Sequence, residues 1–384
     1  STSDANTPGT DTLRVAAVQF ATGTDVEENL GTCLRMIDEA ATESPDLIVL
    51  PEFSNHLSVY ESADHCWEVA VDIGGSFLAA IGAKAVEHDC HIVVTVTVRR
   101  EKPTATVTNC WFDPSGSLVA TSDKQVLMGG EREYLSIGSE LGPVIDSAFG
   151  PVAMYSCMEG VVPETPRSLA LGGARLLTNS LNSFALDEAS LHIPVRAAEN
   201  GVFVVAANKI GPLIPEDRVG EYASAMGLPE EAFHGAGESQ VVAPDGTVLA
   251  KGPLRGEAVV IADIDLAATA DRSAVGGTDR IADRRPEAYG PLGAEGTKPV
   301  LGSDTPIDVI ALSSEGDEGI AETRSAARAG VALVVLPELA ADVGALRAAL
   351  AGTETVAVTT IRDGETHRSV VVSAEGVVAG SAPM

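Results

Sequence analysis

The sequence is poor in aromatic residues and lacks long apolar segments. Phe, Trp and Tyr make up 4% of its 384 residues, so the core must rest mainly on Val, Leu, Ile and Ala. No apolar run approaches the ~18–20 residues that span a bilayer, which argues against a membrane-spanning helix. Residues 1–12 lack a basic segment followed by an apolar one, which predicts a disordered leader rather than a signal peptide. A cytoplasmic location is therefore expected.

Basic residues are also scarce, with 25 Lys and Arg against 55 Asp and Glu, for a net charge of −30. A surface this negative repels phosphate backbones and anionic lipids. The composition therefore predicts neither a nucleic-acid partner nor a membrane partner, and it favours solubility.

The cysteines are few, odd in number and irregularly spaced, at Cys33, Cys66, Cys90, Cys110 and Cys157. With no Cys-x-x-Cys pair, the pattern argues against both a disulfide framework and a zinc site. Four of them are typical of small core residues, and Cys157 differs because it ends an apolar strand.

Apolar strands alternate with amphipathic helices along most of the chain, which predicts an α/β fold with helices covering sheets. A capping box of Thr24 and Glu27 is expected to begin the first helix. The alternation extends over 13–270 and includes an insertion at 211–234. Residues 271–300 are rich in Gly, Arg, Asp and Pro without an apolar period, which predicts a linker or an extended arm.

The segment 301–384 repeats the pattern of the first strands and helices. Val331–Leu339 (VALVVLPEL) corresponds to Asp46–Phe53 (DLIVLPEF), and later strands show a similar correspondence. The repeat ends before any counterpart of Lys124, so we interpret 301–384 as a partial, non-catalytic copy. Half of an α/β layer leaves one apolar sheet face to be covered, by the catalytic domain or by another subunit.

Three short segments carry chemistry-bearing residues in the order Glu, Lys, Cys. Glu52 follows a buried strand in VLPEF, and Lys124 follows hairpin strands in SDKQVL. Cys157 lies between an apolar strand and a helix N-terminus, where the positive potential is expected to favour the thiolate and lower the thiol pKa.

The cysteine segment, with Glu159, Pro163, Glu164, Arg167, Leu169, Ala170, Gly173 and Ala174, resembles the signature of the nitrilase superfamily. Further sequence motifs of the family match Arg196–Asn200 and Ala206–Asn208, so the resemblance covers about 13–265. It implies a four-layer αββα catalytic domain, followed here by the partial C-terminal repeat.

The resemblance also implies roles for individual residues. Cys157 would attack the carbonyl carbon, Glu52 would carry protons, and Lys124 with the backbone N–H of Met158 would hold the oxyanion. The second glutamate of the family fits Glu131, with Glu133 as the alternative. No step needs a metal or an organic cofactor.

The family's substrates suggest hydrolysis of a small linear amide to an acid and ammonia through a cysteine thioester. Carbamoyl-amino-acid hydrolases of the family resemble one another in carrying arginine after the cysteine motif, where this chain has Gly160, Val161 and Val162; neutral substrates are therefore favoured. The alternatives are nitrile hydrolysis, acyl transfer from the thioester, and a non-catalytic assembly module. A homodimer or higher homo-oligomer is expected.

Overall fold

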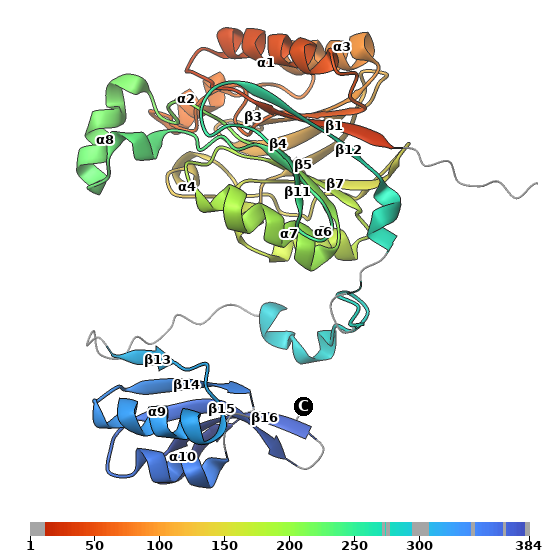
Figure 1. Ribbon diagram of the computed structural model, residues 1–384. Coiled ribbons are helices and arrows are strands. Elements are labelled where there is room, and N and C mark those ends of the chain that lie inside the picture. The colour runs from red at the N-terminus through yellow and green to blue at the C-terminus, as the bar shows by residue number, and fades with distance from the viewer. Residues whose placement is uncertain are drawn as a thin grey trace, which may run out of the picture. The chain divides into compact units, whose positions relative to one another are not determined.

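The computed structural model describes residues 12–270, 273, 277–293, 307–338, 342–363 and 366–380 (Figure 1). The chain divides into two compact units, Ser1–Ala288 and Tyr289–Met384. All but the last residue of the predicted leader lies outside the described residues, as does part of the predicted linker. Within the described residues, every helix is too short or too polar to cross a membrane.

The first unit contains two six-stranded sheets. The first sheet has the order β12-β1-β2-β3-β4-β5. Its strands β1, β2 and β3 are parallel, whereas β12 pairs antiparallel with β1, β4 with β3, and β5 with β4. The bounds are β1 (Leu13–Gln19), β2 (Leu47–Val49), β3 (His91–Arg99), β4 (Ala105–Phe112), β5 (Leu118–Asp123) and β12 (Ala258–Ile264).

The second sheet has the order β11-β10-β9-β8-β7-β6. Strands β7, β8 and β9 are parallel, and the remaining pairs are antiparallel. The bounds are β6 (Ile145–Ser147), β7 (Gly150–Ser156), β8 (Leu176–Ser180), β9 (Phe203–Ala207), β10 (Gln240–Val242) and β11 (Val248–Lys251).

Helices cover the outer face of each sheet, as Figure 1 shows. The outer face of the first sheet packs against α1 (Val26–Ala41) and α3 (Ser76–His88), and that of the second against α6 (Glu164–Leu171) and α7 (Ile193–Asn200). Between the two sheets lies an apolar core that contains Val49, Met154 and Val205. The predicted αββα four-layer arrangement is therefore confirmed.

One local prediction about α1 is wrong. The helix is capped by Asp25 and not by Thr24: the Asp25 carboxylate accepts hydrogen bonds from the backbone N–H groups of Glu27 and Glu28. Aspartate is as good an N-cap as serine or threonine, and its charge also favours the positive helix end. The helix therefore begins one residue later than a capping box at Thr24 requires.

Shorter elements connect the layers of the first unit. The insertion 211–234 forms α8 and two single turns of 3-10 helix, which agrees with its predicted short helical segments. A π-helix, η1 (Glu188–His192), leads into α7. The other helices of this unit are α2 (Ala63–Val69), α4 (Glu131–Tyr134), α5 (Met158–Val161), η2 (Glu216–Arg218), α8 (Val219–Met226), η3 (Glu230–Phe233), η4 (Leu266–Ala270) and η5 (Pro286–Ala288). The 3-10 turn η6 (Gly290–Gly293) belongs to the second unit.

The second unit holds one five-stranded sheet in the order β13-β14-β15-β16-β17, with two helices on one face. Its strands pair parallel, parallel, antiparallel and antiparallel, which is the pairing of β1 to β5. Helices α9 and α10 connect the parallel strands, as α1 and α3 do in the first unit. The bounds are β13 (Val309–Ala311), α9 (Gly316–Arg328), β14 (Leu333–Glu338), α10 (Val343–Leu350), β15 (Val356–Asp363), β16 (Thr366–Ser373) and β17 (Gly376–Gly380).

Candidate active site

Three strand ends bring the predicted site residues to one edge of the sandwich. Glu52 follows β2, Lys124 follows β5, and Cys157 follows β7. Hydrogen bonds across the two sheets fix this edge: the backbone N–H of Glu52 donates to the carbonyl of Leu181 at 3.2 Å, and the Ser180 hydroxyl donates to the carbonyl of Leu50 at 2.7 Å. The two sheets therefore cannot slide at this edge without breaking these bonds.

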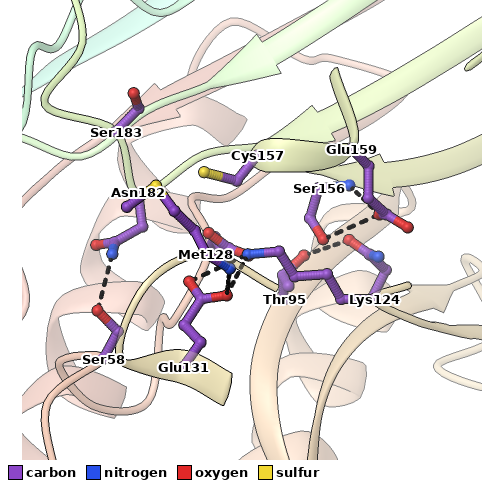
Figure 2. A network of polar contacts seen from close by, with 12 residues as sticks. Ser58, Thr95, Lys124, Met128, Glu131, Ser156, Cys157, Glu159, Asn182 and Ser183 are labelled. Atoms are coloured by element: carbon purple, nitrogen blue, oxygen red, sulfur yellow. Dashed lines mark hydrogen bonds and ion pairs between the residues drawn. The ribbon is translucent and has the colours of Figure 1, made fainter. Parts of the chain in front are cut away.

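Lys124 lies between two carboxylates in a buried cluster. Its Nζ is 2.7 Å from Glu52 Oε1 and 2.9 Å from Glu131 Oε2. Both oxygens of Glu131 accept hydrogen bonds from the ammonium, at 3.1 and 2.9 Å, and Glu52 forms a close ion pair with it. The backbone N–H of Met128 also donates to Glu131 at 3.0 Å, as Figure 2 shows. Glu133, the alternative for the second glutamate, is exposed.

Burial and charge set the protonation of this cluster. Burial raises the pKa of Glu52 to about 7, although Lys124 opposes the shift. Burial alone would lower the pKa of Lys124, but the charges of Glu52 and Glu131 outweigh it and raise that pKa. The site thus keeps a fixed ammonium beside a carboxyl group that can exchange protons near neutral pH.

Cys157 lies in a strained backbone conformation, with φ 48° and ψ −111°. A residue other than Gly in such a region costs ~1–3 kcal/mol and needs support from its surroundings. That support comes from its own N–H, which donates to Asn179 Oδ1 and to the carbonyl of Ser180, both at 3.0 Å. The sulfur lies beside the carboxylate of Glu52, whose ionised form it favours.

The expected low pKa of the Cys157 thiol is wrong. Burial, followed by the charge of Glu52, raises the pKa of this thiol well above its ordinary value, although Lys124 pulls it down. The helix after it, α5, has only four residues, so its N-terminal potential is weak. Cys157 therefore rests as a thiol and needs a neighbouring base to lose its proton.

Met158, the predicted oxyanion donor, is the first residue of α5 and directly follows Cys157. The N–H groups of the first helical turn have no partner within their own helix. The backbone N–H of Met158 is therefore a hydrogen-bond donor without a helical partner, one residue after Cys157.

Glu159 has a role that the sequence did not indicate. Its carboxylate accepts a hydrogen bond from the backbone N–H of Gln125 at 3.0 Å and another from that of Ser156 at 2.8 Å. These donors are the neighbours of Lys124 and Cys157, so one buried carboxylate joins the segments that hold both. The motif marks Glu159, but the contact to Gln125 spans 34 positions and no local pattern reveals it.

Two other buried charged residues lie near the site, Lys209 and Glu188. The ammonium of Lys209 donates to the carbonyl of Phe53 at 2.9 Å, and burial lowers its pKa to about 7. Burial raises the pKa of Glu188 to about 7, and its charge acts on Cys157. Lys209 directly follows the family mark Ala206–Asn208, which could have drawn attention to it; Glu188 carries no such signal.

Among the described residues, three possible metal ligands come together at Asp38, Glu87 and His88, between α1 and α3. Lys84 already supplies a cation there, with its Nζ 2.6 Å from Asp38 and 2.8 Å from Glu87. We therefore interpret the group as a surface ion-pair cluster.

The αββα fold and the buried cluster of Glu52, Lys124, Glu131 and Cys157 are those of a class of carbon–nitrogen bond hydrolases. Residues 14–273 match the carbon-nitrogen hydrolase family. The chain belongs to this family and thereby to the nitrilase superfamily. The predicted resemblance is therefore confirmed, and the C-terminal unit lies beyond the matched residues.

The chain is similar to proteins that have different activities. The chain is 26% identical over 263 residues to a nitrilase from Pyrococcus abyssi, covering 68% of this chain and 93% of that protein. It is 24% identical over 290 residues to N-carbamoylputrescine amidase from Arabidopsis thaliana, covering 72% and 93%. The crystal structure of an amidase from Nesterenkonia sp. superposes with a TM-score of 0.60 at 20% identity, covering 73% and 96%.

Proposed function

We propose that this enzyme hydrolyses a small linear amide to a carboxylic acid and ammonia through a thioester on Cys157. The observation that carries the proposal is the buried Glu52–Lys124–Glu131 cluster, with the Cys157 thiol beside Glu52. It provides the nucleophile, the proton carrier and the fixed positive charge that amide cleavage requires.

The first half of the reaction forms the thioester. Glu52 takes the thiol proton as the Cys157 sulfur attacks the carbonyl carbon, and the negative charge moves to the carbonyl oxygen. The ammonium of Lys124 and the N–H of Met158 stabilise that oxyanion; one such donor is typically worth ~10²–10³ in rate. Glu52 then gives its proton to the departing nitrogen, the C–N bond breaks and ammonia leaves.

The second half returns the enzyme to its starting state. Glu52, ionised again, takes a proton from a water molecule that attacks the thioester carbon. The C–S bond breaks, the proton returns to the sulfur, and the acid is released. Because Glu52 both accepts and donates a proton in each half, a pKa of about 7 suits it at neutral pH.

Glu131 and Glu159 act as positioning residues in this proposal. Glu131 keeps the Lys124 ammonium charged and fixed, because both its oxygens accept from Nζ. Glu159 fixes the distance between the segments of Lys124 and Cys157.

Nitrile hydrolysis by the same residues is the second candidate, and similarity to the Pyrococcus abyssi nitrilase favours it. Acyl transfer to another amine or thiol, and a non-catalytic assembly role, are the further alternatives. The buried, fully assembled cluster argues against the last, because burying three charges is costly and serves no assembly function.

A matched substrate panel tests the proposal. The purified enzyme is incubated with aliphatic amides and with the nitriles of the same acyl chains, and ammonia release is measured together with the mass of the intact protein. Amide turnover with a transient acyl adduct on Cys157 is expected, and it should be absent in Cys157→Ala. Ammonia from nitriles alone would favour the second candidate, and no turnover of either would remove both.

We also propose that residues 301–384 form a non-catalytic partial repeat, joined through a linker at 271–300 to a catalytic domain at 13–270. Glu338 takes the place of Glu52, but its side chain is 65% exposed and pairs with His367 Nδ1 at 3.0 Å. The sequence from Ile307 to Met384 contains neither Cys nor Lys. This segment therefore lacks both a nucleophile and a cation of the required kind.

A further inference from the structure

The sheet of the C-terminal unit has two faces of very different character. Side chains that alternate along its strands point to opposite faces. One set packs under α9 and α10 in a buried apolar cluster that includes Val334, Ala357 and Val370. The other set has no helix over it, and its central members form what we call the open row: Ala311, Val335, Val358 and Val371.

The catalytic unit contains an equivalent row in the same strand order. Register pairs across β1 to β4 place Ala17, Val49, Val93 and Trp111 side by side. All four are fully buried, because the second sheet of the catalytic unit packs on them. In the open row, by contrast, Ala311 is exposed and the three valines are half-buried. The open row is thus the counterpart of a surface that this fold covers with another sheet.

The open row also has the chemistry of a packed sheet face. Its members are aliphatic and mostly β-branched, and the row above it, Val309, Leu333 and Val356, continues the apolar surface. Val309 is 54% exposed. Side chains of this kind are typical of the interface between stacked sheets.

The rest of the described chain offers no free sheet to cover this face. Each catalytic sheet packs against helices on its outer side and against the other sheet on its inner side. Among the described residues, the C-terminal unit therefore holds the one sheet that has no second sheet on its apolar face within its own unit. A sheet that could cover it in the manner of the catalytic unit must come from another molecule.

We propose that the open row packs against the same row of a second copy of this chain, forming a sheet-on-sheet pair about a two-fold axis. A self-complementary apolar face is what a two-fold interface needs, since each copy contributes the same patch. The arrangement would recreate, between two chains, the sheet contact that the catalytic unit makes within one.

The size of the face sets the expected strength of the pair. Five strands at ~4.8 Å and about six residues at ~3.3 Å give a face of ~500 Å² per copy. Both copies together bury ~1,000 Å², which is at the lower limit of stable interfaces. We therefore expect association that depends on protein concentration rather than a permanent dimer.

Sedimentation velocity of the full chain over a range of concentrations tests the proposal. Val358→Glu places a charge in the centre of the open row and should weaken self-association at least tenfold, because pairing would bury the charge without a partner. Ala321→Glu adds the same charge on the exposed side of α9 and should leave the association unchanged. Amide turnover should be equal in all three proteins, since Val358 is not part of the catalytic cluster.

A milder variant keeps the test valid if Val358→Glu fails to fold. Val358→Thr preserves the side-chain shape and adds one hydroxyl, so it should fold and weaken the association to a smaller degree. Wild type that stays monomeric at every concentration would overturn the proposal. So would association that neither Val358 variant changes, which would indicate that other surfaces hold the copies together.

Discussion

The ammonium of Lys209 and the carbonyl oxygen of Phe53 form a 2.9 Å hydrogen bond in a region where both side chains are fully buried. Phe53 directly follows Glu52, and its φ of 54° is rare for residues other than Gly. Lys209 also lies over the ring of Phe53, 5.9 Å from its centroid. It therefore stabilises the turn that directs the carboxylate of Glu52 towards Lys124.

Lys209→Met should change stability in a pH-dependent way and lower activity. Burial lowers the pKa of Lys209 to about 7, below the unfolded value of ~10.4. Between these values the unfolded chain binds more protons, so the contribution of Lys209 to stability rises with pH. The Tm of Lys209→Met minus that of wild type should thus be more positive near pH 6 than near pH 9. Activity should fall about tenfold, because the Phe53 carbonyl loses its donor.

Thermal denaturation at the two pH values and kcat/KM on the best amide check this prediction. Lys251→Met is the matched control, because Lys251 is an exposed lysine paired with Glu238 on the surface. A Tm difference that does not vary with pH would show that Lys209 keeps an ordinary pKa in the folded protein.

Cys157→Ala should lower turnover by more than ~10³-fold while leaving the fold intact. Cys90→Ala, in the same unit, should retain activity. Iodoacetamide should modify Cys157 first, for reasons of access and not of a low thiol pKa: Cys157 is 5% exposed, whereas the other four cysteines are 1% exposed or less. Peptide mass mapping after brief alkylation measures the order, and faster modification of another cysteine would contradict the geometry of the site.

The rate should rise with pH through about 7. Glu52 must be ionised to take the thiol proton, and burial raises its pKa to about 7. The ionised fraction is small below that pH and approaches one above it, so the acidic limb of log kcat/KM should bend near 7. Glu52→Gln should remove both the limb and nearly all activity. A limb that bends near 4.5 instead would mean that Glu52 is better solvated than its burial indicates.

The sequence predicts well which residues meet at the site, but it predicts their pKa values poorly. Glu52 and Cys157 each follow an apolar strand, and Lys124 follows a half-exposed hairpin strand. Because catalytic groups collect at strand ends in α/β sheets, their proximity could be expected from the local pattern. The pKa of Cys157 depends on burial and on the charge of Glu52, which no local pattern gives.

Glu159→Gln should lower both kcat and stability. A glutamine has one carbonyl oxygen and cannot accept hydrogen bonds from the N–H groups of Gln125 and Ser156 in the present geometry. One buried donor left without a partner costs ~1–3 kcal/mol. We expect kcat to fall about tenfold with little change in KM, because the substrate contacts remain. Glu133→Gln, at an exposed position of α4, serves as the control, and equal behaviour of the two variants would show that Glu159 does not position the site.

The substrate preference should favour neutral amides over amides that carry a carboxylate. The three residues that follow Glu159 offer no cation: they are Gly160, Val161 and Val162, and the two valines are half-buried and apolar. A side chain at Gly160 would not fit either, since a Cβ there would lie 2.9 Å from Tyr155 Cε2 and 3.3 Å from Asn179 Nδ2. A buried carboxylate without a partner costs at least ~3 kcal/mol, which corresponds to ~100-fold in affinity.

Butyramide and succinamate form a suitable pair, because they differ mainly in a terminal methyl group against a carboxylate. We expect kcat/KM for butyramide to exceed that for succinamate by about 100-fold or more. Val162→Arg should narrow this ratio by supplying a charge partner, whereas Val162→Leu should not. If wild type hydrolyses both amides equally, a cation from elsewhere must meet the carboxylate, and the candidate is Lys209, a buried lysine on whose pKa the charge of Glu52 acts. In that case Lys209→Met would lower succinamate turnover selectively, because the neutral amide needs no such partner.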